Sequence, residues 1–269
     1  MCYDISFTVS VPEIQDYFPE LVYDEQMEFN FGPVDHIQGV GVFGSHPVLY
    51  TNRDDNKVHL RMMEWSCIEF HVKKEPEIQK RIGMLNIRSE RILDDPASYW
   101  YKIRNRRCLV PVTGIFEHRE VAGFKNKIPY HVRPKGDARI FFLPGLYSVA
   151  EIPDLETGEL VTRSTFGIIT RRANSLMKEI HNHGERKGRM PLFLPLDLGR
   201  EFLSNELTPE RYREILQYEI DSSELEFHTT YTIRSMKLRS DGKQKHEPWT
   251  WAGDTSIPGF EGNPQIDPL

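Results

Sequence analysis

Cysteine is scarce in this chain, with three residues among 269. Cys2, Cys67 and Cys108 are odd in number and show no CxxC spacing, which argues against a disulfide framework and against a zinc knuckle. Free thiols in a reducing compartment are the simpler interpretation. We therefore expect a protein without a bound metal or cofactor.

Long hydrophobic runs are also missing. No apolar stretch approaches the roughly 20 residues that a bilayer-spanning helix needs. The first ten residues, MCYDISFTVS, lack both the basic region and the continuous apolar stretch of a secretory signal. These absences exclude a membrane protein at this stage and predict a cytoplasmic one.

An excess of positive charge is the third absence, since the formal net charge is −6. This charge speaks against indiscriminate nucleic-acid binding, which depends on Lys and Arg at the contacting face. It does not exclude a local basic groove, because such residues are concentrated in segments 102–107, 186–189 and 234–245. Solvated faces and loops are the alternative interpretation of each segment.

The pattern of β-branched and aromatic residues predicts more strands than helices. Strands are expected at 40–50, 107–112, 129–132, 140–149, 165–170 and 226–233. Helices are expected at 13–18, 95–102, 172–180 and 209–217, the last with Thr208 as N-cap. Because the two kinds do not alternate regularly, the sequence favours an α+β fold with a mainly antiparallel, barrel-like sheet and flanking helices.

No internal repeat or low-complexity linker divides the chain, so we expect one domain over residues 1–250 and a C-terminal tail over 251–269. The tail is rich in Pro and Gly and is expected to lie on the surface or to be disordered. Segments 151–164 and 182–188 are expected to be exposed loops because of their Gly, Asp, Glu and Asn content.

The second residue is the first chemical signal. If Met1 is removed, Cys2 presents an amine that titrates near pH ~7.7–8.0 beside a thiol that titrates near ~8.5. Such a 1,2-aminothiol attacks an aldehyde through its amine to give a Schiff base, and closes through sulfur to a thiazolidine ring. A second-position cysteine is more often incidental, so Cys2 alone is weak evidence.

Three further segments carry candidate groups. In Asn86-Ile87-Arg88-Ser89-Glu90, an extended backbone would point the amide, the guanidinium and the carboxylate to the same side. Asn can orient a nucleophile and Arg can bind a phosphate. The polar solvent face of an edge strand is the alternative interpretation.

Residues 107–118, Arg-Cys-Leu-Val-Pro-Val-Thr-Gly-Ile-Phe-Glu-His, predict an apolar strand that leads through a Gly turn to Glu117. The preceding apolar pair, Ile115 and Phe116, is expected to shield this carboxylate from water and suit it to acid–base work. An ordinary surface Glu is the alternative.

Residues 173–181, Ala-Asn-Ser-Leu-Met-Lys-Glu-Ile-His, place His181 at the end of a predicted helix, and Arg189-Met190-Pro191 follows after a short loop. A helix C-terminus favours the protonated imidazole, which suits a proton shuttle. A lone histidine is more often structural.

In this order, the four segments resemble the SRAP family, the SOS response-associated peptidases. The resemblance covers the chain from Cys2 to about Leu194, with a weaker match near 226–237. It implies a protein of the DNA damage or SOS response that recognises abasic sites in single-stranded DNA and bonds to them covalently through the N-terminal Cys. A monomer in the cytoplasm, associated with the nucleoid when bound to DNA, is expected.

The resemblance also implies roles for individual residues. Cys2 resembles the nucleophile, Asn86 the group that orients the N-terminus, and Glu117 and His181 the proton-transfer pair. The residues implied to contact DNA, by phosphate binding, base stacking or a basic groove, are Arg88, Arg189, Trp65 and Arg106.

Departures from the family pattern occur at Ile87, which replaces Ala, at His118, which replaces Trp, and at segment 182–188, which lengthens the connection between His181 and Arg189. The family's Trp-Gly-Leu-Pro-type element is present only as residues 65–71, Trp-Ser-Cys-Ile-Glu-Phe-His. Two other functions remain as alternatives. An N-terminal-nucleophile peptidase or amidase uses the same residues, with Cys2 attacking a carbonyl. A single-strand-binding module would carry Cys2 only incidentally.

Overall fold

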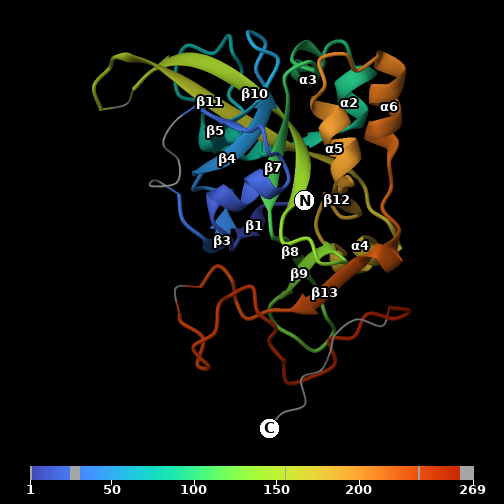
Figure 1. Cartoon of the computed structure of the whole chain (residues 1–269). Coiled ribbons are helices and arrows are strands. Elements are labelled where there is room, and N and C mark those ends of the chain that lie inside the picture. The colour runs from blue at the N-terminus through green and yellow to red at the C-terminus, as the bar shows by residue number, and fades with distance from the viewer. Residues whose placement is uncertain (1, 25–30, 155, 236, 261–269) are drawn as a thin grey trace.

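Five strands form a closed barrel at the centre of the molecule (Figure 1). The computed structural model describes residues 2–24, 31–154, 156–235 and 237–260. The strands of the barrel are β4 (Ser45–Thr51), β5 (Val58–Trp65), β7 (Arg107–Val112), β10 (Phe141–Pro153) and β11 (Leu160–Arg172). Every backbone edge within this ring is therefore paired.

Four neighbouring pairs in the ring are antiparallel: β5–β4, β4–β7, β7–β10 and β10–β11. The fifth pair, β11–β5, is parallel, with Thr165 opposite Glu64 and Phe166 opposite Trp65. An odd number of strands cannot alternate in direction around a closed ring, so one parallel junction is required. Strand β6 (Asn86–Arg88) also pairs in parallel with β11.

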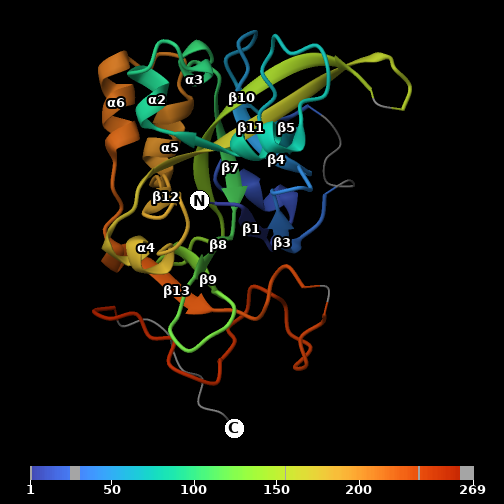
Figure 2. The same cartoon turned by 180° about the vertical axis from the view of Figure 1, so that it is seen from behind.

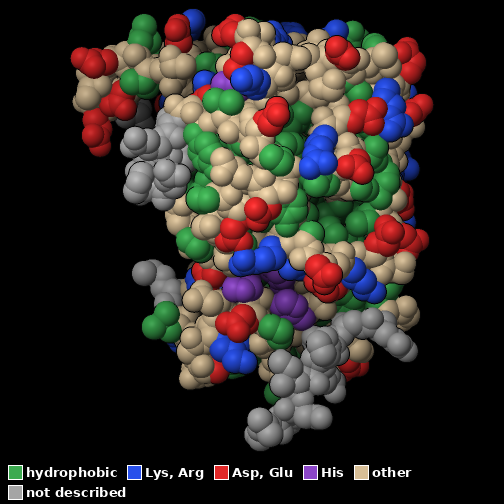
Figure 3. All heavy atoms as spheres, in the orientation of Figure 1, with side chains coloured by type: hydrophobic (Ala, Val, Ile, Leu, Met, Phe, Trp, Pro, Cys, Tyr) green, Lys and Arg blue, Asp and Glu red, His purple; other side chains and the backbone are tan. Residues whose placement is uncertain are grey.

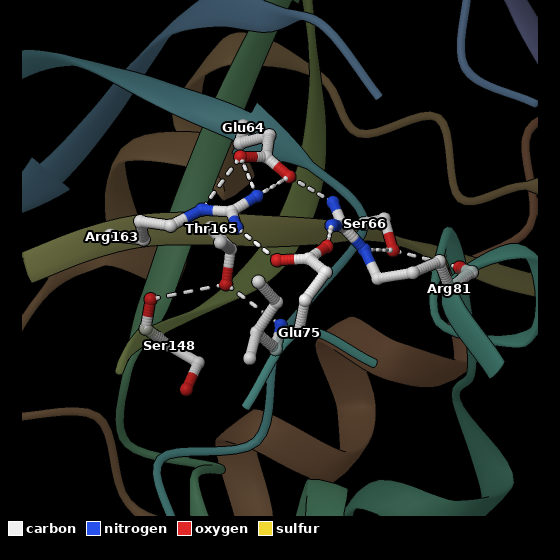
Figure 4. Close-up of polar contacts among 8 residues, drawn as sticks. Glu64, Ser66, Glu75, Arg81, Ser148, Arg163 and Thr165 are labelled. Atoms are coloured by element: carbon white, nitrogen blue, oxygen red, sulfur yellow. Dashed lines mark hydrogen bonds and ion pairs between the residues drawn. The ribbon is translucent and has the colours of Figure 1, made fainter. Parts of the chain in front are cut away.

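An ion-pair network lies at this parallel junction (Figure 4). Arg81, from α1 (Ile78–Gly83), contacts Glu64 and Glu75, and its side chain is 3% exposed. Arg163 contacts the same two carboxylates, with its Nε 3.0 Å from an oxygen of Glu64. The network thus has two guanidinium groups and two carboxylates, so its charges cancel. Ser66 joins it by donating a 2.7 Å hydrogen bond to the carbonyl of Arg81.

The two sides of the barrel wall belong to separate hydrophobic clusters. Cys108 and Val110 of β7 belong to one cluster, whereas Leu109 between them belongs to the other, as the two-residue period of a strand requires. The second cluster includes residues of α5 (Leu196–Leu203) and α6 (Pro209–Gln217). These helices flank the barrel on one side in both views (Figures 1 and 2).

A second, five-stranded sheet carries the N-terminal strand. Its order is β13 (Leu225–Thr229), β9 (Ile128–Pro134), β8 (Gly114–Arg119), β1 (Asp4–Phe7) and β3 (Val34–Gln38). The chain passes from β7 to β8 through a single residue, Thr113. Gly114 is required there because a Cβ atom would lie 1.7 Å from Nε2 of His131.

The remaining elements are short: η1 (Val11–Asp16), β2 (Val22–Tyr23), α2 (Glu90–Leu93), α3 (Tyr99–Lys102), α4 (Ser175–Ile180), β12 (Arg189–Pro191) and η3 (Ser222–Glu224). None of the helices in the described part of the chain has the length and apolar character that crossing a membrane demands. The prediction of an α+β domain with a mainly antiparallel, barrel-like sheet and flanking helices is confirmed.

Several predicted elements have the observed bounds. Strand 107–112 and helix 209–217 coincide with β7 and α6, and the Thr208 side chain accepts a hydrogen bond from the backbone of Arg211, as an N-cap does. Strand 140–149 was predicted too short, and the loop predicted at 151–164 is wrong. The β10–β11 hairpin continues until Pro153 pairs with Leu160, so the polar turn residues occupy only its tip.

The described part of the expected tail, residues 251–260, lies against the second sheet. Trp251 donates its indole N–H to the carbonyl of Thr230 at 3.0 Å, and Ile257 is 3% exposed. Tyr130 and Arg119 also bond to backbone carbonyls of this segment. Residues 261–269, which the expected tail includes, lie outside the described residues.

Candidate active site

Cys2 is fully buried at the start of β1. Its carbonyl oxygen accepts a 2.8 Å hydrogen bond from the side-chain amide of Asn86, and its Sγ lies 3.9 Å from the carbonyl oxygen of Asp4. Burial raises the pKa of the Cys2 thiol well above its usual value, and the negative charge of Glu117 raises it further. The thiol is therefore protonated at neutral pH in this arrangement.

Asn86 is held in place by the barrel. Strand β6 pairs with β11, with Asn86 opposite Ile168, and the Asn86 side chain is 7% exposed. While its amide nitrogen donates to Cys2, its Oδ1 is buried and has no hydrogen-bond partner among the described residues. An acceptor oxygen thus lies on the same amide that orients Cys2, and it can receive an N–H.

Glu117 reaches the same place from β8, which pairs directly with β1 so that Phe116 lies opposite Asp4. Glu117 is 4% exposed, which confirms the expectation that its carboxylate is shielded from water. Its charge acts on the pKa values of both Cys2 and His181. The carboxylate is thus electrostatically coupled to both groups.

His181 follows the last residue of α4 and is its C-cap. Its Nδ1 lies 2.9 Å from the carbonyl oxygen of Arg189. Because a carbonyl only accepts, Nδ1 carries the proton, and Nε2 is the basic nitrogen of the neutral ring. Burial lowers the pKa of His181, and the charge of Glu117 opposes this only in part. The expectation that the helix end favours the protonated ring is therefore wrong, since desolvation outweighs it.

A cavity of about 440 Å³ adjoins these residues and is lined by both Glu117 and His181. Segment 182–188, the predicted exposed loop, forms one wall with His183, Gly184, Glu185 and Arg186. Arg186 donates a 2.8 Å hydrogen bond to the hydroxyl of Tyr3, which joins this loop to the N-terminal segment. The structure thus brings the four predicted residues together: Asn86 is hydrogen-bonded to the buried Cys2, and Glu117, which acts on Cys2, lies with His181 on the cavity wall.

Four lining residues were not selected from the sequence: Tyr3, Asp4, Lys127 and Arg234. Asp4 is 1% exposed and receives a 2.9 Å contact from His36 and two hydrogen bonds from Arg234. Burial alone would raise the pKa of Asp4, but these hydrogen bonds outweigh it and hold the pKa below its usual value. The basic segment 234–245 was the one available signal for Arg234. Nothing in the local sequence of the other three distinguishes them from surface residues.

The predicted DNA contacts have different environments. Arg88 is exposed at the end of β6, as a phosphate contact requires. Trp65 is 1% exposed, stacks on Phe166 with ring centres 6.2 Å apart, and donates its indole N–H to the carbonyl of Leu85. Its predicted role as a stacking platform for a base is wrong, because the ring belongs to the barrel core.

Arg189 is 9% exposed and binds both carboxylate oxygens of Glu90, at 2.6 and 3.0 Å, as well as the carbonyl of Thr170 at 2.7 Å. These bonds commit its guanidinium to joining β12 and α2, in place of the predicted phosphate contact. Arg106 stands just before β7, at the end of that strand away from β8, and its guanidinium carbon lies 5.9 Å from the centre of the Phe70 ring. It is not among the residues that line the cavity, and its DNA contact stays a prediction.

Charges of both signs are interspersed over the face in Figure 3, where histidine and basic side chains gather near β9 and β13. No group of three or more His, Cys, Asp or Glu side chains within the described ranges is arranged to hold a metal ion. The arrangement at Cys2 offers a thiol nucleophile beside a carboxylate and an imidazole that can transfer protons.

Comparison with known proteins agrees with this fold. Among solved structures, a protein from Bacteroides thetaiotaomicron has a TM-score of 0.72 and 26% identity, with 92% of this chain and 97% of that chain covered. A protein from Bordetella bronchiseptica has a TM-score of 0.64 at 14% identity, over 86% of this chain and 100% of that one. The latter likeness shows the shared fold alone.

Two curated proteins are similar in sequence. The abasic site processing protein YoaM of Bacillus subtilis is 28% identical over 231 residues, covering 85% of this chain and 88% of that protein. The abasic site processing protein YMR114C of Saccharomyces cerevisiae is 26% identical over 182 residues, covering 65% of this chain and 44% of that protein. The model of the SOS response associated peptidase family matches residues 1–233. The chain therefore belongs to the SOS response associated peptidase (SRAP) family.

Proposed function

We propose that this protein captures abasic sites in single-stranded DNA by forming a thiazolidine crosslink through Cys2. The observation that carries the proposal is the meeting of Cys2, Asn86, Glu117 and His181 beside one cavity, although they come from four separate elements. The names of the two curated relatives, both abasic site processing proteins, support the same substrate.

The reaction begins once Met1 is removed and the Cys2 nitrogen is a free amine. This amine attacks the aldehyde carbon of the ring-opened abasic sugar, and the resulting carbinolamine loses water to give a protonated imine. The Cys2 sulfur then adds to the imine carbon and gives up its proton, which closes the ring. One aldehyde, one amine and one thiol thus give one thiazolidine and one water.

The surrounding residues supply orientation and proton transfer. Asn86 holds the Cys2 carbonyl, and the unpartnered Oδ1 of its amide offers an acceptor for the amine N–H. Glu117 and the basic Nε2 of His181 remove and return protons during the loss of water and the addition of sulfur.

The order of the two bonds follows from the buried thiol. Because burial raises the thiol pKa, sulfur is a poor nucleophile until a base takes its proton. The amine therefore reacts first, and the iminium charge beside the sulfur then favours ionisation of the thiol.

Arg88 contacts a phosphate of the strand outside the cavity.

The same residues support two enzymatic activities that belong to this proposal. Attack of the Cys2 thiol on the Met1 carbonyl would move the Met1 acyl group from nitrogen to sulfur and free the Cys2 amine. Water would then hydrolyse this thioester and release Met1, which completes an autoproteolytic step. Breakdown of the imine by β-elimination would cleave the strand, which is a lyase-like reaction.

The deciding experiment mixes processed protein with single-stranded DNA that carries one abasic site, and separates the products on a denaturing gel. We expect a stable one-to-one adduct. Cys2→Ala should give only a labile adduct and strand cleavage, because its amine can form the imine but no ring. A chain with an added, unremovable residue before Cys2 should give no adduct, and efficient crosslinking by this blocked chain would contradict the mechanism.

The gel also separates the other two functions. A peptidase or amidase would turn over a peptide substrate repeatedly and leave the DNA unmodified. A plain single-strand-binding module would retard the strand on a native gel and form no covalent product.

A further inference from the structure

A second cavity, of about 380 Å³, adjoins the first. His118, Lys127 and Arg234 line both cavities, so the two are neighbours that share part of their walls. The second cavity is lined by the β8–β9 connection and by the segment that follows β13. A strand with one sugar in the first cavity can therefore place an adjoining nucleotide at the second.

The walls of this second cavity are aromatic. Trp251 lies parallel to Tyr231, with ring centres 6.2 Å apart and an angle of 12° between the planes, and Phe124 meets Trp251 edge-on at 6.2 Å. All three rings line the cavity and are partly exposed. Such rings provide flat apolar surface of the kind on which nucleobases stack.

The indole of Trp251 is fixed rather than loose. Its N–H donates to the carbonyl of Thr230, and the backbone N–H of Trp249 donates to the carbonyl of Thr229. Gly253 has φ +133°, and a Cβ atom there would lie 2.9 Å from the Phe124 ring, so glycine lets this segment pack closely on Phe124. The aromatic wall is therefore built by the fold.

The charge of this cavity differs from that of the first. Its described lining contains Lys125, Lys127 and Arg234 and no carboxylate, whereas the first cavity contains Asp4, Glu117 and Glu185. Because Arg234 is already paired with Asp4, the positive charges available to a ligand are those of Lys125 and Lys127. A cavity with aromatic walls and two lysines suits a group that combines a flat ring with a phosphate. A nucleotide has this combination.

We propose that the second cavity binds the nucleotide next to the abasic site, with its base stacked on the aromatic wall of Phe124, Tyr231 and Trp251 and its phosphate at Lys125 and Lys127. The inference rests on the proposed function, which puts the abasic sugar in the first cavity. It assigns a role to Trp251, which lies beyond residue 233, where the match to the family model ends. The substrate is thus an abasic site whose adjoining nucleotide still carries its base.

The test uses a single strand with a tetrahydrofuran analogue of the abasic site, which has no aldehyde and cannot crosslink. The fluorescent base 2-aminopurine is placed in turn at each position beside the analogue. We expect quenching on binding at one of these positions, and Trp251→Ala should abolish the quenching and weaken binding about 10-fold. The matched control is Phe70→Ala, since Phe70 is 42% exposed and lines neither cavity.

A second strand replaces both neighbours of the analogue with tetrahydrofuran units. The wild-type protein should bind this second strand about 10-fold more weakly than the first strand. Trp251→Ala should bind the two strands equally well, because it already lacks the stacking surface. Phe124→Leu keeps apolar volume and removes the aromatic face, so it should show a smaller loss in the same direction. Equal losses for wild type and Trp251→Ala on the second strand would overturn the proposal.

Two outcomes distinguish related ideas. The first outcome concerns a free mononucleotide added at millimolar concentration as a competitor. If it displaced the bound strand as effectively as a second strand does, the cavity would be a free-nucleotide site and the inference would be overturned. With true abasic DNA, Trp251→Ala should crosslink slowly at low DNA concentration and at the wild-type rate at saturation. Absence of any crosslink by the wild type would instead refute the proposed function, and the non-crosslinking strands would still report on the cavity.

Discussion

Two of the regions that bury charged groups differ in how the charges are paired. At the β5–β11 junction, Arg81 and Arg163 each contact both Glu64 and Glu75, so opposite charges match one for one. Beside the first cavity, the charge of Glu117 acts on the pKa values of Cys2 and His181, which burial moves away from their usual ranges. In the first region, ion pairs offset the free-energy cost of burying the charges. In the second region, burial instead changes the pKa values of groups that can react.

The comparison separates two reasons for burying a polar group. A closed ion-pair network holds strands together through matched opposite charges. A buried thiol and imidazole with shifted pKa values can exchange protons with a substrate. Substitutions in the two regions should therefore affect different measurements.

The largest effect is expected at the cavity. Glu117→Gln or His181→Ala should slow crosslinking by about 10²–10⁴-fold, because each removes a proton-transfer group. DNA affinity and the thermal unfolding midpoint should change little. Single-turnover gels at saturating DNA measure the rate, and a variant that is slow only because it binds DNA poorly would contradict the assigned role.

The next effect is expected at the junction. Arg81→Met should lower the free energy of unfolding by about 3–5 kcal/mol, because it leaves two carboxylates facing a single guanidinium in a partly buried site. Urea denaturation measures the loss. The crosslinking rate per folded molecule should be unchanged.

The matched control neutralises one charge of each sign. Arg81→Met combined with Glu75→Gln should be more stable than Arg81→Met alone, since charge balance with Arg163 and Glu64 is restored. A double variant less stable than the single one would mean that packing of the Arg81 side chain, and not charge balance, stabilises the junction.

A smaller effect concerns pH. Burial lowers the pKa of His181, so the ring stays neutral and basic below the ordinary histidine value of about 6.5. As the pH falls, the Cys2 amine takes up a proton, and a plot of the logarithm of the crosslinking rate against pH should have slope one. The slope should become two only below the lowered pKa of His181. His181→Ala should keep slope one throughout, and a slope of two that persists in this variant would assign the second proton elsewhere.

The smallest effect separates an exposed arginine from a paired one. Arg88→Ala should reduce the salt dependence of single-strand binding by about 0.7 in the slope of log K against log salt, as expected for one lost phosphate contact. Arg189→Ala should leave that slope unchanged, because Arg189 is already bonded to Glu90 and Thr170. Titrations at several salt concentrations measure both, and equal changes would remove the distinction.

The sequence predicted which residues meet beside the first cavity better than it predicted their surroundings. Cys2, Asn86, Glu117 and His181 could be selected because their segments occur together in the order of the SRAP family, whereas each segment alone also had an ordinary structural interpretation. Trp65 was misassigned because an aromatic side chain suits a core and a DNA surface equally well. Only the packing of Phe166 against it decides the matter.

Long-range pairing explains the other differences. The polar content of 151–164 indicated a loop, yet β10 and β11 stay paired almost to the turn because each strand supports the other. Strand β1 is four residues long and gives too little pattern to be recognised. Asp4 and Arg234 meet across 230 positions of sequence, a separation that no local pattern predicts.

The single parallel junction also has a kinetic consequence. Glu64 and Arg163, which meet there, are 99 positions apart in the chain, so closing the ring costs the entropy of a very long loop before any contact offsets it. A growing polypeptide reaches β11 only after β4, β5, β7 and β10 have been made. Until then the end of β5 at Glu64 and Trp65 has an unpaired edge, although β2 pairs with this strand at His59 and Leu60. The barrel should therefore close late in folding, and chains that end before residue 160 should aggregate through that edge.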